Sequence, residues 1–212
     1  MIYELRMYTT KPGKMKHVVN SSATVAQKIR NGDTYGKLIG HWWSQIGKMN
    51  QYVHMWEYQN VDEMRRLRSE LSSRDDWKKE FVPLVGPYIL SQEIRLLRSL
   101  SDLKKPSNIN NFYELKIINL NIGKVGQWIT GFNNLVNKIE NESLNIGVWQ
   151  TELSNPNEIV SIWSHSSVER MQMFWEKLEN NSLWKKFMDF QESSVKEEQT
   201  IILRPSSCSP LQ

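Results

Sequence analysis

The sequence predicts an α+β protein of two tandem ferredoxin-like (βαββαβ) units, whose sheets we expect to cover each other in one barrel-like body. Three observations indicate this class. The first half of the 212-residue chain recurs in the second half, which is typical of an internal duplication. Each copy has the periodicities of a strand, a helix, two strands, a helix and a strand. Aromatic residues, nine tryptophans among them, would leave one face of each sheet in need of cover.

The duplication is visible without any gap at the start of each copy. IYELRMYTTKPGKMKHVV begins at Ile2 and matches FYELKIINLNIGKVGQWI, which begins at Phe112. DDWKKEF recurs later as SLWKKFM, which sets Trp77 against Trp184. We therefore expect a first unit at residues 1–100, a polar connector that contains proline at 101–111, and a second unit at 112–212.

The elements follow in order along the first unit. Residues 2–8 alternate as a strand, Pro12-Gly13 interrupts it, and residues 14–30 carry apolar side chains at helical spacing. Residues 38–45 and 51–58 are predicted to form a hairpin around Gly47-Lys48. Residues 61–71 and 76–81 are predicted helices, and residues 89–98 form the last strand. This order predicts an antiparallel four-stranded sheet with its helices on one face.

Composition and charge exclude several classes of protein. The net charge is +4 with a pI near 9.1, but the basic residues have acidic neighbours, as on a solvated helix face. The strand QYVHMWEY lacks the basic motif of RNA-recognition modules. The single Cys208 excludes an internal disulfide, and the histidines lack zinc-type spacing. We therefore expect no nucleic-acid partner, no metal and no other cofactor.

Location and assembly are also constrained. The apolar runs are too short for a membrane span, and the first residues lack the pattern of a secretory signal. We expect a cytoplasmic protein, or a mitochondrial one if a transit peptide has been removed. Open sheet edges make a homodimer plausible.

The predicted hairpin contains the candidate site. A turn centred on Gly47-Lys48 places Trp42 opposite His54 and Gly40 opposite Trp56. A glycine there would leave room for the indole. His41 would then lie on the opposite face from His54, so the two would not share a ligand.

The first strand indicates which side chains accompany this hairpin. Glu4, Arg6 and Tyr8 share one face, and Leu5 and Met7 share the other. The apolar pair suits packing under helices, so we expect the polar set to point into the barrel interior. The Glu4–Arg6 pair would bind a polar group there or serve as a salt-bridged structural feature.

His54 would act as a general base, or as an inert hydrogen-bonded side chain. It is absent from the second copy, where Ser161 replaces it. The first unit is therefore the expected place for any reactive end. The candidate catalytic residues are His54, Arg6 and Glu4, and the candidate ligand-binding residues are Tyr8, Trp42, Trp56 and Tyr52.

These segments together resemble the NIPSNAP family. The resemblance rests on YELRMYTTKPGK, IGHWWSQIGKMNQYVHMWEY, DDWKKEFVPLV, LSQEIRLLR and SCSPL, and it spans nearly the whole chain. It implies the dimeric α+β barrel superfamily, which includes cofactor-independent monooxygenases and haem enzymes. It supplies no established catalytic residues, and eukaryotic relatives are largely mitochondrial and act in vesicle-related and mitophagy signalling through protein partners.

Two functions remain open from the sequence. The first is a barrel that binds a small, largely apolar molecule, as a carrier or as a cofactor-independent, monooxygenase-like enzyme. The alternative is a non-catalytic protein-interaction module with a solid interior and its binding surface on the helices.

Overall fold

The computed structural model describes residues 1–107, 109, 111–136, 138 and 143–212. Asn108 and Asn110, which belong to the expected connector, lie outside the described residues. The chain divides into two compact units. Residues Met1–Arg98 and Leu203–Gln212 form the first, and Ser99–Ile202 form the second. The C-terminal residues thus complete the first unit rather than the second.

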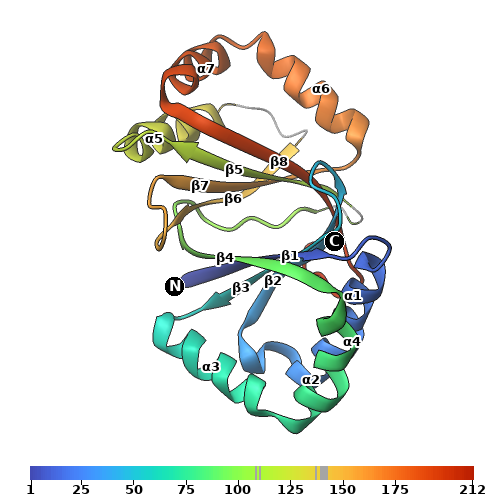
Figure 1. Ribbon diagram of the computed structural model, residues 1–212. Helices are drawn as coiled ribbons and strands as arrows, with labels where there is room; N and C mark the ends of the chain where they lie inside the picture. Colours follow the sequence, from blue (N-terminus) through green and yellow to red (C-terminus); the bar gives the residue numbers. More distant parts are fainter. Residues whose placement is uncertain (108, 110, 137, 139–142) are drawn as a thin grey trace. The chain divides into compact units, whose positions relative to one another are not determined.

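The first unit has the predicted βαββαβ order (Figure 1). Its sheet runs in the order β2-β3-β1-β4, all antiparallel. The strands are β1 (Ile2–Thr10), β2 (Lys37–Ile46), β3 (Gln51–Tyr58) and β4 (Ile89–Ser99). The helical segments are α1 (Met15–Ser21), η1 (Ser22–Ala26), α2 (Gln27–Arg30), η2 (Gly32–Tyr35), α3 (Val61–Ser73), η3 (Trp77–Phe81), α4 (Val82–Val85) and η4 (Gly86–Tyr88).

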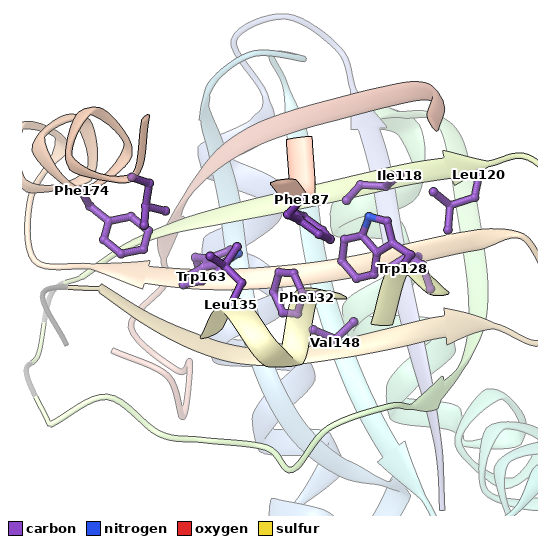
Figure 2. Close-up of a cluster of buried hydrophobic side chains, with 11 residues drawn as sticks. Ile118, Leu120, Trp128, Phe132, Leu135, Val148, Trp163, Phe174 and Phe187 are labelled. Atoms are coloured by element: carbon purple, nitrogen blue, oxygen red, sulfur yellow. The ribbon is translucent and has the colours of Figure 1, made fainter. Parts of the chain in front are cut away.

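The second unit repeats the plan with the order β6-β7-β5-β8. Its strands are β5 (Phe112–Leu120), β6 (Ser143–Thr151), β7 (Glu158–His165) and β8 (Val195–Pro205), the last of which ends in the first unit. Its helices are α5 (Val125–Val136), α6 (Val168–Glu179) and α7 (Ser182–Ser194). A core of buried side chains from β5, β6, β7 and all three helices holds this unit together (Figure 2). No helix among the described residues is long and apolar enough to cross a membrane.

The register of the first hairpin differs from the prediction. His41 lies opposite His54, Trp42 opposite Val53, and a bulge after Leu38 breaks the register before Gly40. The predicted pairs of Trp42 with His54 and Gly40 with Trp56 are therefore wrong. The strands pair one residue away from the assumed turn centre, and a shift of one residue exchanges the two faces of a strand.

The glycine nevertheless accommodates an indole. A Cβ at Gly40 would overlap the ring of Trp42, which lies two residues further along the same strand. The second hairpin repeats this arrangement, since a Cβ at Gly147 would come within 2.6 Å of the Trp149 ring. In both hairpins the glycine thus makes room for a tryptophan of its own strand, and not for one across the hairpin.

The two faces of β1 are also reversed relative to the prediction. Arg6 and Tyr8 lie against side chains of the helices, together with Tyr52 and His54 of β3. Leu5 and Met7, predicted to pack under the helices, lie on the other face and are fully buried. Strand alternation shows which residues share a face, but it does not show which face the helices cover.

Candidate functional site

A cavity of about 150 Å³ lies within the first unit, between the sheet and its helices. The sheet contributes side chains of β1, β3 and β4, and the helices contribute apolar, aromatic and basic side chains. The lining residues are Arg6, Tyr8, Val18, Ser22, Ala26, Arg30, Tyr52, His54, Trp56, Arg68, Trp77, Phe81, Val85 and Ile89.

Glu4 supplies the carboxylate beside this cavity. Its Oε1 accepts a hydrogen bond from Arg6 Nε at 2.8 Å, and its Oε2 pairs with the Arg68 guanidinium. Arg6 also donates from Nη1 to the Tyr8 hydroxyl at 3.0 Å. Arg68 Nε is buried without a hydrogen-bond partner, and burial lowers the pKa of Arg68 to about 10. One carboxylate is thus shared between two guanidinium groups.

Arg30 is a third cation in the cavity, and no carboxylate among the described residues pairs with it. Its side chain is only 5% exposed. The guanidinium carbon lies 3.9 Å from the ring centroid of Trp56 and 5.5 Å from that of Trp77. Nη1 donates to the Tyr35 carbonyl at 3.2 Å, and Arg30 makes no ion pair with any described residue. Burial lowers the pKa of Arg30, but a guanidinium keeps its charge in proteins.

His54 is a neutral imidazole whose tautomer is set by its neighbour. Its Nδ1 lies 2.5 Å from the indole nitrogen of Trp56. An indole N–H only donates, so Nδ1 accepts and the proton of His54 resides on Nε2. Burial first, and then the charges of His41, Arg6 and Arg30, hold the pKa of His54 well below its usual value. His54 lines the cavity, and its hydrogen-bond donor is therefore Nε2.

A second histidine connects the cavity wall to the C-terminal segment. His41 Nε2 lies 3.0 Å from the Tyr52 hydroxyl and 3.1 Å from Ser22 Oγ, and these two oxygens are 2.5 Å apart. On its other side, His41 Nδ1 lies 2.6 Å from Ser206 Oγ. Burial, with a smaller effect of Arg30, lowers the pKa of His41 to about 3, and burial raises the pKa of Tyr52.

The structure gathers six of the seven predicted site residues. Glu4, Arg6, Tyr8, Tyr52, His54 and Trp56 lie on one face of the sheet, beneath the helices. Trp42 does not join them, because it shares the opposite face with Val53. His41 was predicted to lie on the opposite face from His54, but their ring centroids are 6.3 Å apart and the two ring planes are nearly parallel.

Sequence reasoning missed Arg30, Arg68, Ser22 and Ser206. Arg30 follows Val18, Ser22 and Ala26 at intervals of four on one helix face, and a charged residue on such a buried stripe is a usable signal. Ser206 carried no comparable signal, because its contact with His41 joins residues 165 positions apart.

Two irregular helical turns border the cavity. Ser22–Ala26 and Trp77–Phe81 are widened π-helical turns, and their four end residues, Ser22, Ala26, Trp77 and Phe81, all line the cavity. Turns of this kind occur often at functional sites. In the second unit the corresponding helices α5 and α7 are regular over their described length.

Comparison with known proteins identifies the family. The NIPSNAP family model matches residues 3–104 and again residues 113–210. The chain belongs to the NIPSNAP family. Human NipSnap homolog 3A is 25% identical over 217 residues, with 100% of this chain and 86% of that protein covered. Human NipSnap homolog 3B is 24% identical over 215 residues, with 99% and 85% covered.

Solved structures agree with this NIPSNAP assignment at the level of the fold. A candidate monooxygenase from Lactobacillus acidophilus has a TM-score of 0.68 at 12% identity, with 100% of this chain and 98% of that chain covered. An anthrone oxidase-like protein also has a TM-score of 0.68, at 8% identity, with 97% and 91% covered. The predicted fold class is confirmed: two tandem ferredoxin-like units of the kind found in dimeric α+β barrels.

The second unit of this NIPSNAP chain does not repeat the histidine of the site. Glu4 lies opposite Trp56 and Glu114 lies opposite Trp163, so the two strand pairs are equivalent. In the same register, the position of His54 is taken by Ser161. Among the described residues, no group of three or more histidine, cysteine or acidic side chains is placed to hold a metal ion.

Proposed function

We propose that the first unit of this NIPSNAP protein binds a small organic carboxylate with an apolar or aromatic body, in the cavity between its sheet and its helices. The carboxylate would pair with Arg30, and the body would lie against the surrounding rings. The observation that carries the proposal is the buried guanidinium of Arg30, which makes no ion pair with any described residue.

The charge balance of the cavity supports an anionic ligand. Arg6, Arg30 and Arg68 line it, and Glu4 is the only carboxylate that pairs with any of them among the described residues. A buried charge without a counter-ion is costly, whereas a charge with a well-placed partner is much less so. A guanidinium also matches a carboxylate geometrically, because it donates two parallel hydrogen bonds.

The size and lining of the cavity limit the ligand. A cavity of about 150 Å³ in an engineered protein accommodates benzene, and this cavity has about that volume. Tyr8 stacks on Tyr52 at 5.5 Å between ring centroids, and Trp56 and Trp77 flank Arg30. Aromatic walls with one cationic end suit a compact ligand of the size of benzoate.

The protonation states favour binding over acid–base catalysis. A general base works best with a pKa near the working pH. Burial holds the pKa of His41 at about 3, holds that of His54 well below its usual value and raises that of Tyr52. Glu4 is occupied by two arginines. A cofactor-independent oxygenase would need a group that removes a substrate proton, and burial moves the pKa values of His41, His54 and Tyr52 away from neutral pH.

The solved structures with this fold include a candidate monooxygenase and an anthrone oxidase-like protein. Enzymatic roles for His54, Arg6 and Glu4 therefore stay a prediction, as does the alternative of a protein-interaction module. In our proposal Arg6 and Glu4 shape the cavity, and His54 donates a hydrogen bond from Nε2 to the ligand.

Isothermal titration calorimetry with benzoate and benzyl alcohol tests the proposal. We expect benzoate to bind at least tenfold tighter than benzyl alcohol, since a hydrogen bond to a charged group contributes about 1.5–3 kcal/mol. Arg30→Met should remove this preference. Lys28→Met, which removes an exposed cation from the same helical turn, should leave it unchanged.

Two outcomes would overturn the proposal. Equal affinity for the acid and the alcohol would show that the arginines do not receive an anion. If Arg30→Met and Lys28→Met lose the preference for benzoate over benzyl alcohol to the same extent, general surface charge causes that preference. If neither small molecule binds while a purified partner protein does, the interaction-module alternative is favoured instead.

A further inference from the structure

The second unit contains a hollow of about 370 Å³ at the position equivalent to the first cavity. It lies between the β5–β7 face and helices α5, α6 and α7, and Figure 2 shows part of its wall at Trp128, Phe132, Trp163 and Phe187. All of its lining residues belong to the second unit. Four indoles and two phenyl rings make up much of that lining: Trp128, Trp163, Trp175, Trp184, Phe132 and Phe187.

The polar donors of the first cavity are replaced here. Where Arg68 pairs with Glu4, the indole nitrogen of Trp175 donates to the equivalent Glu114 at 2.9 Å. The shared register also places Ile159 at the position of Tyr52. An indole has taken the position of a guanidinium, so this hollow lacks a counterpart of the Arg68 charge.

The charges around the hollow are mainly acidic. Its charged lining residues are one lysine, Lys116, and three glutamates, Glu114, Glu179 and Glu198. The Lys116 ammonium pairs with Glu198 at 2.7 Å and with Glu114 at 3.4 Å. Glu179 is exposed and makes no ion pair with any described residue. One ammonium against three carboxylates leaves a negative balance.

The Lys116 ammonium also shows how this wall receives a cation. It lies 4.9 Å from the ring centroid of Trp175, within the range of a cation–π contact. Trp184 continues the aromatic surface, with its ring centroid 5.5 Å from that of Trp175. Glu179 is one helical turn beyond Trp175 on α6 and lines the same hollow. Indole faces beside a carboxylate are the features that recognise alkylammonium groups.

We propose that this hollow is a second ligand site, specific for a small organic cation whose ammonium group is attached to an apolar body. The ammonium lies beside Trp175, Trp184 and Glu179, and the body packs against Phe132 and Phe187. The duplicated units would then bind ligands of opposite charge. This site is independent of the carboxylate site proposed for the first unit.

The test uses benzyltrimethylammonium, benzyl alcohol and benzoate as probes, titrated calorimetrically at low salt into the Arg30→Met protein, in which the first cavity lacks its free cation. We expect the ammonium probe to bind about tenfold tighter than the alcohol, the size of a desolvated cation–π contact. Benzoate should be the weakest of the three probes.

Variants of the second unit locate the binding. Glu179→Gln should weaken the ammonium probe about threefold or more, in keeping with an exposed charge. Glu176→Gln, on the same helix but outside the lining, should not. Trp184→Leu should weaken the probe about tenfold, as expected for loss of a cation–π surface, with circular dichroism confirming the fold.

The proposal is overturned if the ammonium probe fails to exceed benzyl alcohol in affinity. It is also overturned if Glu179→Gln and Trp184→Leu both bind like the parent protein. Ammonium binding that appears with Arg30 present and disappears in Arg30→Met would assign the cation to the first unit. None of these results alters the benzoate test of the first cavity, so the two proposals succeed or fail separately.

Discussion

Replacing Arg30 by methionine should stabilise the ligand-free protein. The guanidinium is 5% exposed and makes no ion pair with any described residue, and burying an ion costs several kcal/mol even after relaxation. Two contacts offset this cost. The Trp56 ring, 3.9 Å away, contributes about 0.5–2 kcal/mol. The hydrogen bond to the Tyr35 carbonyl contributes about 1.5–3 kcal/mol.

The balance of these terms gives the expected size of the change. Methionine keeps the apolar stem and removes the charge, so we expect the free energy of unfolding to rise by about 1 kcal/mol. For a chain of this length, that corresponds to an increase in Tm of about 2–4 °C. Urea unfolding followed by circular dichroism measures the first quantity, and scanning calorimetry measures the second.

Saturating benzoate should make the parent protein more stable than Arg30→Met, which reverses their order of stability without ligand. At a hundred times its Kd a ligand adds about 2.7 kcal/mol to the native protein, and only the protein with Arg30 should gain it. A loss of more than about 1 kcal/mol in ligand-free Arg30→Met would refute this reasoning, because the indole and carbonyl contacts would then outweigh desolvation. Arg30 would be a structural residue.

Three further changes test other parts of the structure. Glu4→Gln removes the carboxylate shared by two arginines and should lower the free energy of unfolding in urea by about 3 kcal/mol. The control Glu70→Gln, in an exposed pair, should lower it by less than about 0.5 kcal/mol. Equal losses in the two variants would contradict the buried-pair interpretation. Gly40→Ala drives a methyl group into the Trp42 ring and should cost about 2 kcal/mol; a variant as stable as the parent would show that the indole can move. Burial holds the pKa of His41 at about 3, whereas the unfolded chain takes up this proton near pH 6.5, so stability is full above about pH 6.5 and falls as the pH drops towards 3, by about 2 kcal/mol from this group at pH 5. His41→Asn should lose less stability between pH 7 and pH 5 than the parent. If the two proteins lose the same free energy of unfolding over this range, the low pKa of His41 is contradicted.

The repeat and the order of its elements could be predicted because both depend on local patterns. Strand alternation and helical spacing are set by neighbours in the sequence, and the duplication confirms each element twice. The predicted helix at residues 14–30 is one continuous helical stretch, Met15–Arg30, with a widened turn at its centre. Six of the seven proposed site residues lie together for the same reason, since alternation correctly grouped Glu4, Arg6 and Tyr8.

The register and the choice of face could not be obtained in this way. A bulge after Leu38 and a one-residue shift in the hairpin brought His41 beside His54 and moved Trp42 to the other face. Arg30 and Arg68 reach the cavity from helices, and Ser206, near the C-terminus, contacts His41 behind the cavity wall. Such contacts depend on tertiary packing, which strand and helix periodicity do not encode.

Isotope-filtered NMR on benzoate bound to the protein would show directly whether the first cavity receives an anion. We expect nuclear Overhauser effects from the benzoate ring protons to the rings of Tyr8, Tyr52 and Trp56, and their loss in Arg30→Met. Overhauser effects to Trp184 of the second unit instead, or the same spectrum with and without Arg30, would contradict a carboxylate site built around that buried guanidinium.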